Sequence, residues 1–482
     1  MSSQPPRFAW ITRDRCLLAA VLLAALAIRG GVLWTLRGNL SADPDAYRQI
    51  AENLLRHGVF AMGQSEHPQP TAYRPPLYPV VLSNLPAADG RHVSLGKVAV
   101  LHVLLGVGTV WLTWLIARRV GQANEVSADP RGNQSSNPRG SSAAAALSHP
   151  TIAALLVACD PILLHQQSLV MTETLATFLA VLALWCLSRF SDCRSWFWAG
   201  LSGGAIGLAA LCRPTFVPWL GLVGVGMLVV HGWEFRIQYS EFRLKQGSPQ
   251  PQQLSWSGLA GRLANAVALL VVATGIMSPW VIRNYRVFGR PIATTTHGGY
   301  TLYLANNPEF YAHLRGQDLL PWAPSVNFPG EIFPQIYLAP TPEQFELYMD
   351  GWLKNQAQQT MRADPGGAWR ACTYRIAQLW SPLPHKLTAE ESTSRMMLRY
   401  ATCVWYCGVY ALAAVGLWRL RGGLLAPPWI WGVLLCLAFT AVHTFYWTNL
   451  RMRAPLMPFV ALVTAAALMP RNLGPARRPP HG

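Results

Sequence analysis

Charged residues are scarce in this sequence: only 13% of its 482 residues are Asp, Glu, Lys or Arg, whereas 51% are hydrophobic. That balance excludes an ordinary soluble domain, in which about a quarter of the residues are charged. The sequence also lacks a CxxC pair, and its nine cysteines are scattered, mostly within apolar runs. We therefore expect neither a disulfide framework nor a cysteine metal site.

Motifs for handling nucleotides are missing as well. The sequence contains no GxxxxGK[ST] loop, no HExxH pair, no Rossmann fingerprint and no nucleic-acid-binding module. This disfavours an enzyme that uses ATP or a nucleotide sugar. The net charge of +17 does not indicate a nucleic-acid partner, because the basic residues lie in short tracts between apolar runs.

Ten apolar runs are long enough to cross about 30 Å of hydrocarbon, and they predict an all-α polytopic membrane protein. They lie at 16–36, 96–117, 150–168, 173–190, 197–212, 214–231, 263–282, 399–418, 428–446 and 454–470. The first run is too long for the core of a signal peptide, so we expect it to be retained as a transmembrane helix. In the fifth run, Gly200-Leu201-Ser202-Gly203-Gly204 matches GxSxG, but inside an apolar run this pattern indicates close helix packing rather than a nucleophile.

Lysines and arginines in the short connections set the orientation. With the N-terminus in the cytoplasm, the inside connections hold Arg118, Arg119, Arg189, Arg194, Arg236, Arg243, Lys245, Arg419, Arg421, Arg471, Arg477 and Arg478. Both termini are then cytoplasmic, and two long segments, 37–95 and 283–398, lie outside.

The chain divides into three expected parts. Residues 1–282 form a transmembrane core with the first external loop 37–95 and a Ser-, Ala- and Asn-rich cytoplasmic insertion at 121–146, which we expect to be disordered. Residues 283–398 form a small extracytoplasmic domain of α or mixed structure, with a helix from about Pro342 to Arg362. Residues 399–482 carry the last transmembrane helices and a basic tail.

Two aspartates in the first external loop are the strongest candidates for chemistry. Asp43 and Asp45 precede an amphipathic helical pattern that begins at Tyr47. One interpretation is a helix cap, in which the carboxylate accepts backbone N–H bonds. The other is a general base for an acceptor hydroxyl, and the two aspartates can divide these roles. Arg74 follows in a stiff, proline-rich segment, where it would bind either a ligand or lipid headgroups.

Charged and polar residues also stand at the outer ends of other apolar runs. Glu173 lies in a tight turn between two runs, where a carboxylate is a functional candidate unless it is a solvated or helix-start acid. Because Lys and Arg normally gather on the inside, outer arginines favour an anionic ligand over headgroups alone. These outer residues are Arg283, Asn284, Arg451 and Arg453.

The sequence resembles the GT-C superfamily of integral membrane glycosyltransferases, in particular the bacterial group related to dolichyl-phosphate-mannose protein mannosyltransferases and to aminoarabinose transferases of lipid A. The motifs that carry the resemblance are Asp43 through Tyr47, Arg74-Pro75-Pro76-Leu77-Tyr78-Pro79, Thr172-Glu173, Leu211-Cys212-Arg213-Pro214, Pro279-Trp280 with Arg283-Asn284-Tyr285, and Arg451-Met452-Arg453-Ala454-Pro455. They occur in the family order along the whole chain. The last motif departs from the family pattern, which usually has a tyrosine where Met452 stands.

The resemblance implies a GT-C fold in a bacterial plasma membrane and transfer of a sugar, a hexose or pentose, from a polyprenyl-phosphate donor. Transfer would occur on the extracytoplasmic face, with inversion, to a protein, lipid or glycan acceptor. By its distance from Tyr47, Asp43 matches the family base, with Asp45 as its rival. Tyr47, Arg74, Glu173, Arg283, Asn284, Arg451 and Arg453 would bind substrate or lipid phosphate. Some members use a divalent cation, and the two aspartates leave metal dependence open.

Two other functions compete with this interpretation. A secondary transporter is also polytopic, but its charged residues gather near the middle of the membrane and its helices form inverted repeats. A noncatalytic protein that assembles envelope polysaccharide is the other alternative. The sugar and the acceptor stay undetermined by the sequence.

Overall fold

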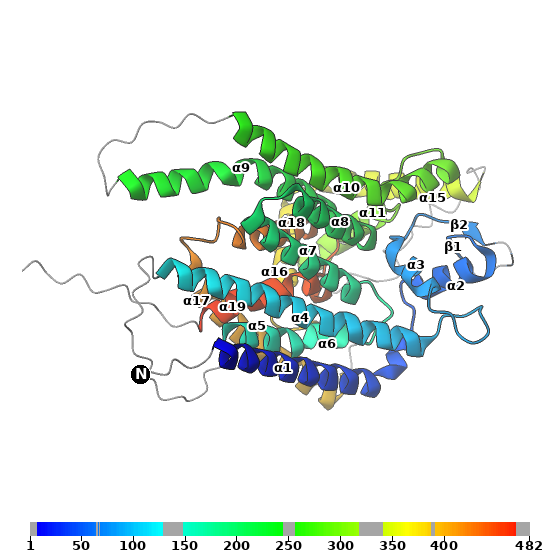
Figure 1. Ribbon diagram of the computed structural model, residues 1–482. Helices are drawn as coiled ribbons and strands as arrows, with labels where there is room; N and C mark the ends of the chain where they lie inside the picture. Colours follow the sequence, from blue (N-terminus) through cyan, green and yellow to red (C-terminus); the bar gives the residue numbers. More distant parts are fainter. Residues whose placement is uncertain are drawn as a thin grey trace, which may run out of the picture.

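Almost every regular element of the protein is an α-helix, as the sequence predicts (Figure 1). The computed structural model describes residues 7–63, 66, 68–128, 148–243, 256–317, 341–386 and 391–468. Within these ranges the one sheet consists of two short antiparallel strands, β1 (Ala61–Met62) and β2 (Gln69–Pro70), with Ala61 opposite Pro70. The prediction of an all-α membrane protein is confirmed.

All ten predicted apolar runs are helical over most of their length. The long helices are α1 (Arg7–Thr35), α4 (Leu95–Ala128), α7 (Glu173–Cys193), α9 (Phe216–Arg243), α10 (Trp256–Phe288) and α17 (Thr393–Leu420), and the shorter ones are α5 (His149–Ala158), α8 (Trp196–Cys212), α18 (Trp429–Phe445) and α19 (Met457–Ala466). Of the described helices, five are long and apolar enough to cross a membrane and four more are apolar but shorter. The number of crossings therefore stays a prediction.

The predicted run 150–168 is not one continuous helix. It breaks after α5, and α6 (Pro161–Gln166) begins three residues later. Asp160 caps α6 by accepting a hydrogen bond from the Leu163 amide at 3.0 Å, and Pro161 has no N–H to continue the preceding helix. A polar cap inside an apolar run thus turns the chain before it reaches Glu173.

The glycine-rich segment of α8 lies directly against α10. A Cβ atom on Gly203 would collide with the backbone of Leu269, and one on Gly207 would stand 3.0 Å from the carbonyl oxygen of Ala273. The Ser202 hydroxyl donates to the Trp198 carbonyl oxygen of its own helix at 2.8 Å. The interpretation as close helix packing is therefore confirmed, since small residues let the two backbones approach.

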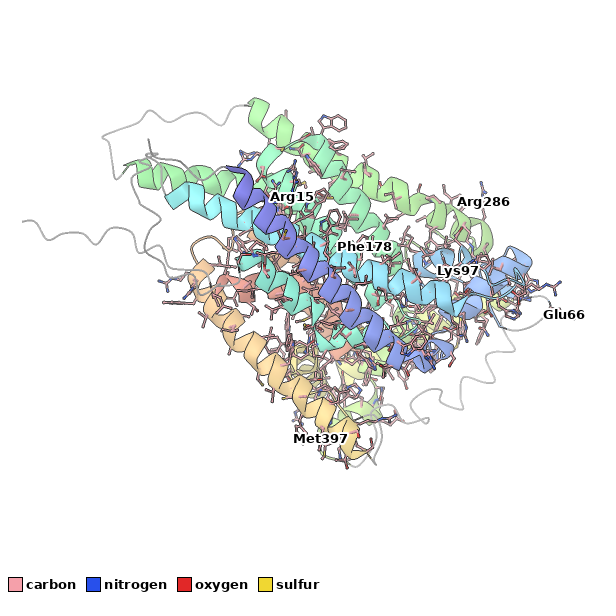
Figure 2. The ribbon with its side chains drawn as sticks, turned by 60° about the horizontal axis from the view of Figure 1, so that its bottom comes forward. Arg15, Glu66, Lys97, Phe178, Arg286 and Met397 are labelled. Carbon is pink, nitrogen blue, oxygen red and sulfur yellow. The ribbon has the colours of Figure 1, made fainter. Side chains whose placement is uncertain are left out.

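The connecting elements gather at one end of the helices, which we call the loop end. Figure 1 shows α2 (Tyr47–His57), β1, β2, α3 (Leu77–Ser83) and α15 (Pro342–Ala363) together at the right of the view. Figure 2 labels Glu66, Lys97 and Arg286 at this end, away from Arg15. The other short elements are the 3₁₀ helices η1 (Arg37–Ser41) and η2 (Leu450–Leu456), together with α11 (Gly298–Ala305), α12 (Pro308–Leu314) and α16 (Pro365–Trp380).

Two sequence predictions about segments outside the core have different outcomes. The helix expected from Pro342 to Arg362 is confirmed as α15, which Thr341 caps by accepting from the Gln344 amide at 3.3 Å. The insertion expected to be disordered from 121 is helical as far as Ala128, because α4 continues to that residue. The rest of that insertion, 129–146, and the basic tail after Leu468 lie outside the described residues.

Replacing Gly203 by valine is expected to separate α8 from α10, because the backbone of Leu269 cannot move aside as a side chain would. Overpacking of this kind costs about 1–3 kcal/mol or more. Thermal unfolding of the detergent-purified protein measures the effect. Gly275→Val is the matched control, since a Cβ on Gly275 of α10 meets nothing within 4 Å; equal melting temperatures for the two variants would contradict the packing argument.

Candidate active site

A cavity of about 620 Å³ lies where the loop end meets the ends of the apolar helices. The turn before α2, the start of α7, the α8–α9 junction, the end of α18 and the start of η2 all contribute to its wall. Its charged lining residues are Asp45, Arg74, Glu173, Arg213 and Arg451. Its volume is typical of a site for a small organic ligand.

The turn before α2 separates the two candidate aspartates. Asp43 Oδ2 accepts a hydrogen bond from the Gln49 amide at 2.9 Å and so caps α2, while Asp45 lines the cavity. Asp43 lines a different, polar cavity on the face of α2. Ala46 closes the turn with a φ of 59°, a left-handed conformation that costs a non-glycine residue about 1 kcal/mol. Asp43 therefore occupies the capping position, and Asp45 is the one of the two that lines this cavity.

Asp45 is held between two arginines. Its Oδ1 lies 2.9 Å from Arg74 Nη2, and its Oδ2 lies 3.7 Å from Arg451 Nη2. Arg74 also lies over the ring of Tyr47, with its Cζ atom 5.6 Å from the centroid. Burial raises the pKa of the Tyr47 phenol, so this side chain stays protonated and can act as a hydrogen-bond donor.

Glu173 forms the second charged group of the cavity. Only 2% of this residue is exposed, so it is not a solvated loop acid. It is the first residue of α7, as the helix-start alternative expects, although the Thr172 side chain makes no capping bond. Glu173 Oε1 lies 3.1 Å from Arg213 Nη1 and 3.6 Å from Arg451 Nε. Arg451 therefore contacts both carboxylates, Asp45 and Glu173, and joins the loop end to the start of α7.

Arg213 lines the cavity. It belongs to one of the family motifs but is not among the site residues predicted from the sequence. Arg213 follows α8 with an extended backbone and also contacts the Met452 sulfur at 2.6 Å. Lys and Arg normally gather on the inside, and this rule singles out Arg283 and Arg451 as unusual. It applies equally to an arginine in the tight turn between two apolar runs on the predicted outer side. The signal was present in the sequence.

Glu346 of α15 holds the segment that carries Arg74 in place. Glu346 accepts hydrogen bonds from the Thr71 hydroxyl at 2.7 Å and from the Ala72 amide at 2.8 Å, and it also accepts from the Thr296 hydroxyl. The Thr296 amide donates to the Ala72 carbonyl oxygen at 3.0 Å. Three donors on one carboxylate hold the backbone just before Arg74, so the guanidinium is presented from a fixed segment.

Arg283 and Asn284 do not line the cavity. Arg283 donates to the carbonyl oxygens of Thr71 and Phe60 at 2.8 and 2.9 Å, and Asn284 donates to the Ile292 carbonyl oxygen at 2.9 Å. Both side chains donate to backbone acceptors: Arg283 fastens the segment around Phe60 and Thr71 onto α10, and Asn284 fastens the chain that follows α10. The expectation that they bind substrate stays a prediction.

Arg453 is likewise absent from the cavity wall. This residue is fully buried, and it donates to the carbonyl oxygen of Leu379 at 3.0 Å and to that of Ser381 at 2.5 Å. Its guanidinium also covers the ring of Tyr406 at 4.3 Å. A cation that satisfies the last carbonyl groups of a helix stabilises its C-terminus. Arg453 therefore joins η2 to the end of α16, away from the cavity wall.

Aromatic side chains line the part of the cavity near Arg74. Tyr73 and His297 make an edge-to-face contact with centroids 4.4 Å apart, and Tyr300 lies 5.2 Å from His297. Burial and the nearby Arg74 charge lower the pKa of His297 to about 3. His297 is therefore uncharged at neutral pH, and it can hydrogen-bond a ligand without adding to the charge of the cavity.

The charged groups of the cavity are a poor fit for a divalent cation. Asp45 and Glu173 are the carboxylates of its wall, and Arg451 contacts both of them. A cation between the two would meet a guanidinium. Within the described part of the chain, no three Asp, Glu, His or Cys side chains are grouped so as to hold a metal ion.

No protein-family model matches the sequence, and no curated protein matches it. The fold is similar to that of three solved membrane proteins. One is oligosaccharyltransferase AglB from Archaeoglobus fulgidus, solved with an inhibitory peptide and a dolichol-phosphate, with 13% identity and a TM-score of 0.44. The match covers 92% of this chain and 50% of the AglB chain. ArnT from Cupriavidus metallidurans, bound to undecaprenyl phosphate, has 16% identity and a TM-score of 0.38, with coverages of 96% and 78%.

The third is arabinosyltransferase EmbB from Mycobacterium smegmatis, with 15% identity, a TM-score of 0.32 and coverages of 97% and 42%. All three are GT-C glycosyltransferases, the superfamily that the sequence resembles. The chain spans about half the length of AglB. These similarities concern the course of the chain, so its chemistry is argued below from the side chains of the site.

Replacing Glu346 by alanine is expected to free the segment before Arg74, because three hydrogen bonds to a carboxylate are lost together. Hydrogen exchange of the Ala72 amide should become faster by about tenfold or more, as expected for a loss of about 1.5–3 kcal/mol. Glu343→Ala on the same helix is the control. Unchanged exchange at Ala72 in the Glu346 variant would show that the segment is held by other contacts.

Protonation of His297 is expected to destabilise the fold at acid pH. Because its pKa is about 3 in the folded protein and about 6.5 when unfolded, the unfolded state binds the proton first as the pH falls. Stability from the neutral ring is complete above about pH 6.5 and is lost toward pH 3. His297→Gln should therefore make the melting temperature less dependent on pH between 7 and 4. Parallel curves for the wild type and the His297 variant would refute this.

Proposed function

We propose that the protein is a glycosyltransferase that moves a sugar from a polyprenyl-phosphate donor to an acceptor, with the cavity as its active site. The observation that carries the proposal is the position of Asp45, a cavity carboxylate held between Arg74 and Arg451. A carboxylate can take a proton from an acceptor, and adjacent guanidinium groups suit a phosphate. The cavity therefore joins a base to an anion site at the end of apolar helices.

The charge of the cavity fits a phosphodiester. Three arginines and two carboxylates line it, and His297 is neutral, so these groups leave a net charge of +1. A sugar linked through a single phosphate to a lipid carries one negative charge, which this surplus balances. A diphosphate donor would bring more negative charge than the cavity neutralises, so we favour the monophosphate.

Transfer is a single displacement in this proposal. Asp45 accepts the proton of an acceptor hydroxyl or amine, whose oxygen or nitrogen attacks the anomeric carbon from the side opposite the phosphate. The bond from the anomeric carbon to the phosphate oxygen breaks, and its electron pair leaves with the lipid phosphate, so the anomeric configuration inverts. Arg74, Arg213 and Arg451 stabilise the negative charge that develops on the leaving phosphate.

Phosphate binding would also release the base. In the free protein, Arg74 and Arg451 both contact the carboxylate of Asp45. A donor phosphate competes for the same guanidinium groups, and each hydrogen bond that it takes leaves Asp45 more available to accept a proton. Glu173, which contacts Arg213 and Arg451, keeps these two arginines directed into the cavity. Tyr47 supplies a neutral donor beside Arg74.

The membrane position follows from the orientation predicted by the sequence. If the loop end is extracytoplasmic, the cavity opens toward the outer face of the plasma membrane, with both termini inside. The wall near α9 and α18 is less polar and contains Pro214, Pro218 and Val442, which suits the first units of a prenyl chain. Protein, lipid or glycan would serve as acceptor, and a hexose or pentose as the transferred sugar.

The alternatives explain the cavity less well. A transporter would hold its substrate near the middle of the membrane, whereas this cavity is lined by segments of the loop end, including Tyr73, His297 and Tyr300. A noncatalytic assembly protein has no need of a carboxylate positioned between arginines. Asp43 stays the second candidate for the base, because its Oδ1 atom has no hydrogen-bond partner in the described structure.

Release of free polyprenyl phosphate from a panel of polyprenyl-phosphate and polyprenyl-diphosphate sugars tests the proposal. Asp45→Asn should lower kcat by about 10²–10⁴-fold, the usual contribution of a general base. Asp43→Asn should have a much smaller effect, because the side-chain oxygen of an asparagine can still cap α2. Asp89→Asn, on the surface of the same external segment, is the matched control.

Each outcome of this experiment has a separate meaning. If Asp43→Asn abolishes release while Asp45→Asn does not, the base is Asp43 and the proposed division of roles is wrong. Preferential use of diphosphate donors would overturn the charge argument. If the folded wild-type protein releases nothing from any donor in the presence of an acceptor extract, the transporter or assembly function is favoured.

A further inference from the structure

A much smaller cavity, separate from the two cavities described above, lies behind Glu173, and we call it the rear cavity. Its volume is about 10 Å³, and Arg29 of α1, Gly106 of α4, Gln166 of α6 and Thr174 of α7 line it together with Glu173. Glu173 therefore stands between two cavities, with the candidate active site on one side and the rear cavity on the other. Nothing in the proposed reaction uses the rear cavity.

Four side chains around the rear cavity each have a polar atom without a hydrogen-bond partner in the described structure. These atoms are Arg29 Nε, Gln166 Oε1, Glu173 Oε2 and Thr174 Oγ1. The residues are only 1%, 6%, 2% and 7% exposed, respectively. A buried polar group without a partner costs about 1–3 kcal/mol, so four around one cavity indicate a shared partner.

The surrounding structure makes room for this arrangement. Arg29 crosses α4 at Gly106, where an added Cβ would stand 2.6 Å from Arg29 Nη1 and 2.9 Å from its Cδ. Each Nη atom makes one hydrogen bond, since Nη1 donates to Gln167 Oε1 at 3.1 Å and Nη2 donates to the Val157 carbonyl oxygen at 3.0 Å. These two contacts fix the guanidinium, and its buried Nε atom has no hydrogen-bond partner in the described structure.

We propose that the rear cavity binds one structural water molecule that links Arg29 to Glu173. The four atoms match the hydrogen-bonding capacity of water, since Arg29 Nε–H and the Thr174 hydroxyl can donate to it, and Gln166 Oε1 and Glu173 Oε2 can accept from it. Buried water commonly makes about three hydrogen bonds to such groups, and a volume of about 10–15 Å³ holds one molecule. The rear cavity has this size.

Other occupants fit less well. A metal or ammonium cation would be repelled by the fixed charge of Arg29, and a phosphate or sugar is far too large for the space. A dry cavity would leave one buried polar atom on each of the four side chains without a partner. Water also accounts for the Glu173 geometry, because it would hold Oε2 at the back while Oε1 faces Arg213 and Arg451.

A pair of threonine substitutions tests this proposal by the sign of a stability change. Thr109 lines the same rear cavity, but its hydroxyl already donates to the Leu105 carbonyl oxygen at 2.8 Å. If water is bound, Thr174→Val removes one of its partners, and the melting temperature should fall by about 1–3 °C. Thr109→Val should change it by less than this.

The opposite sign would overturn the proposal. In a dry cavity the Thr174 hydroxyl is an unpaired buried group, so replacing it by a methyl group should raise the melting temperature above that of the Thr109 variant. A density map of the wild-type protein that resolves ordered waters gives an independent answer. A peak within about 3.2 Å of the four atoms supports the water, and a well-ordered site without a peak refutes it. Neither readout depends on whether the protein transfers a sugar.

Discussion

Arg451 contacts both carboxylates of the cavity, and the arrangement of the loop end depends on this double contact. Asp45 belongs to the first external segment and Glu173 to the start of a buried helix, so one guanidinium connects parts of the chain that are distant in sequence. Burying a carboxylate among apolar helices costs several kcal/mol unless it is paired. Removing Arg451 would leave Arg74 and Arg213 to neutralise the two acids separately.

The need to pair buried polar groups also explains why arginines are so frequent at this end of the protein. Those in the cavity neutralise acids, while Arg283 and Arg453 satisfy backbone carbonyl groups that would otherwise be buried without donors. The second kind of contact fastens the first external loop to α10 and the end of α16 to η2. Contacts outside the cavity therefore fix the segments that form its wall, which favours a preorganised site.

The elements at the loop end serve mainly to position the site in this structure. Glu346 of α15 fixes the backbone before Arg74, and the Asn449 side chain accepts from the Arg451 amide at 3.2 Å. Both contacts place a cavity arginine through its backbone rather than through its charged group. Each guanidinium is thus left free to exchange a carboxylate partner for a ligand phosphate, which is the requirement of the proposed reaction.

Much of this could be predicted from the sequence. Apolar runs of membrane length specify the helices, because each residue in lipid must satisfy its backbone within its own helix. The same runs place Asp45, Arg74, Glu173 and Arg451 near one end, and the small residues around Gly203 predict a close helix contact. Arg213 was within reach of the same reasoning. These inferences depend on composition and on distance along the chain, which the sequence contains directly.

The direction in which each side chain points was decided by tertiary structure. Asp43 and Asp45 are two residues apart, yet the left-handed turn at Ala46 directs one to cap a helix and the other into the cavity. Arg451 and Arg453 are equally close, and a 3₁₀ turn sends one to the carboxylates and the other to the end of α16. A motif sets which groups are available, but their partners come from distant segments, so only the packed chain determines which charge meets which.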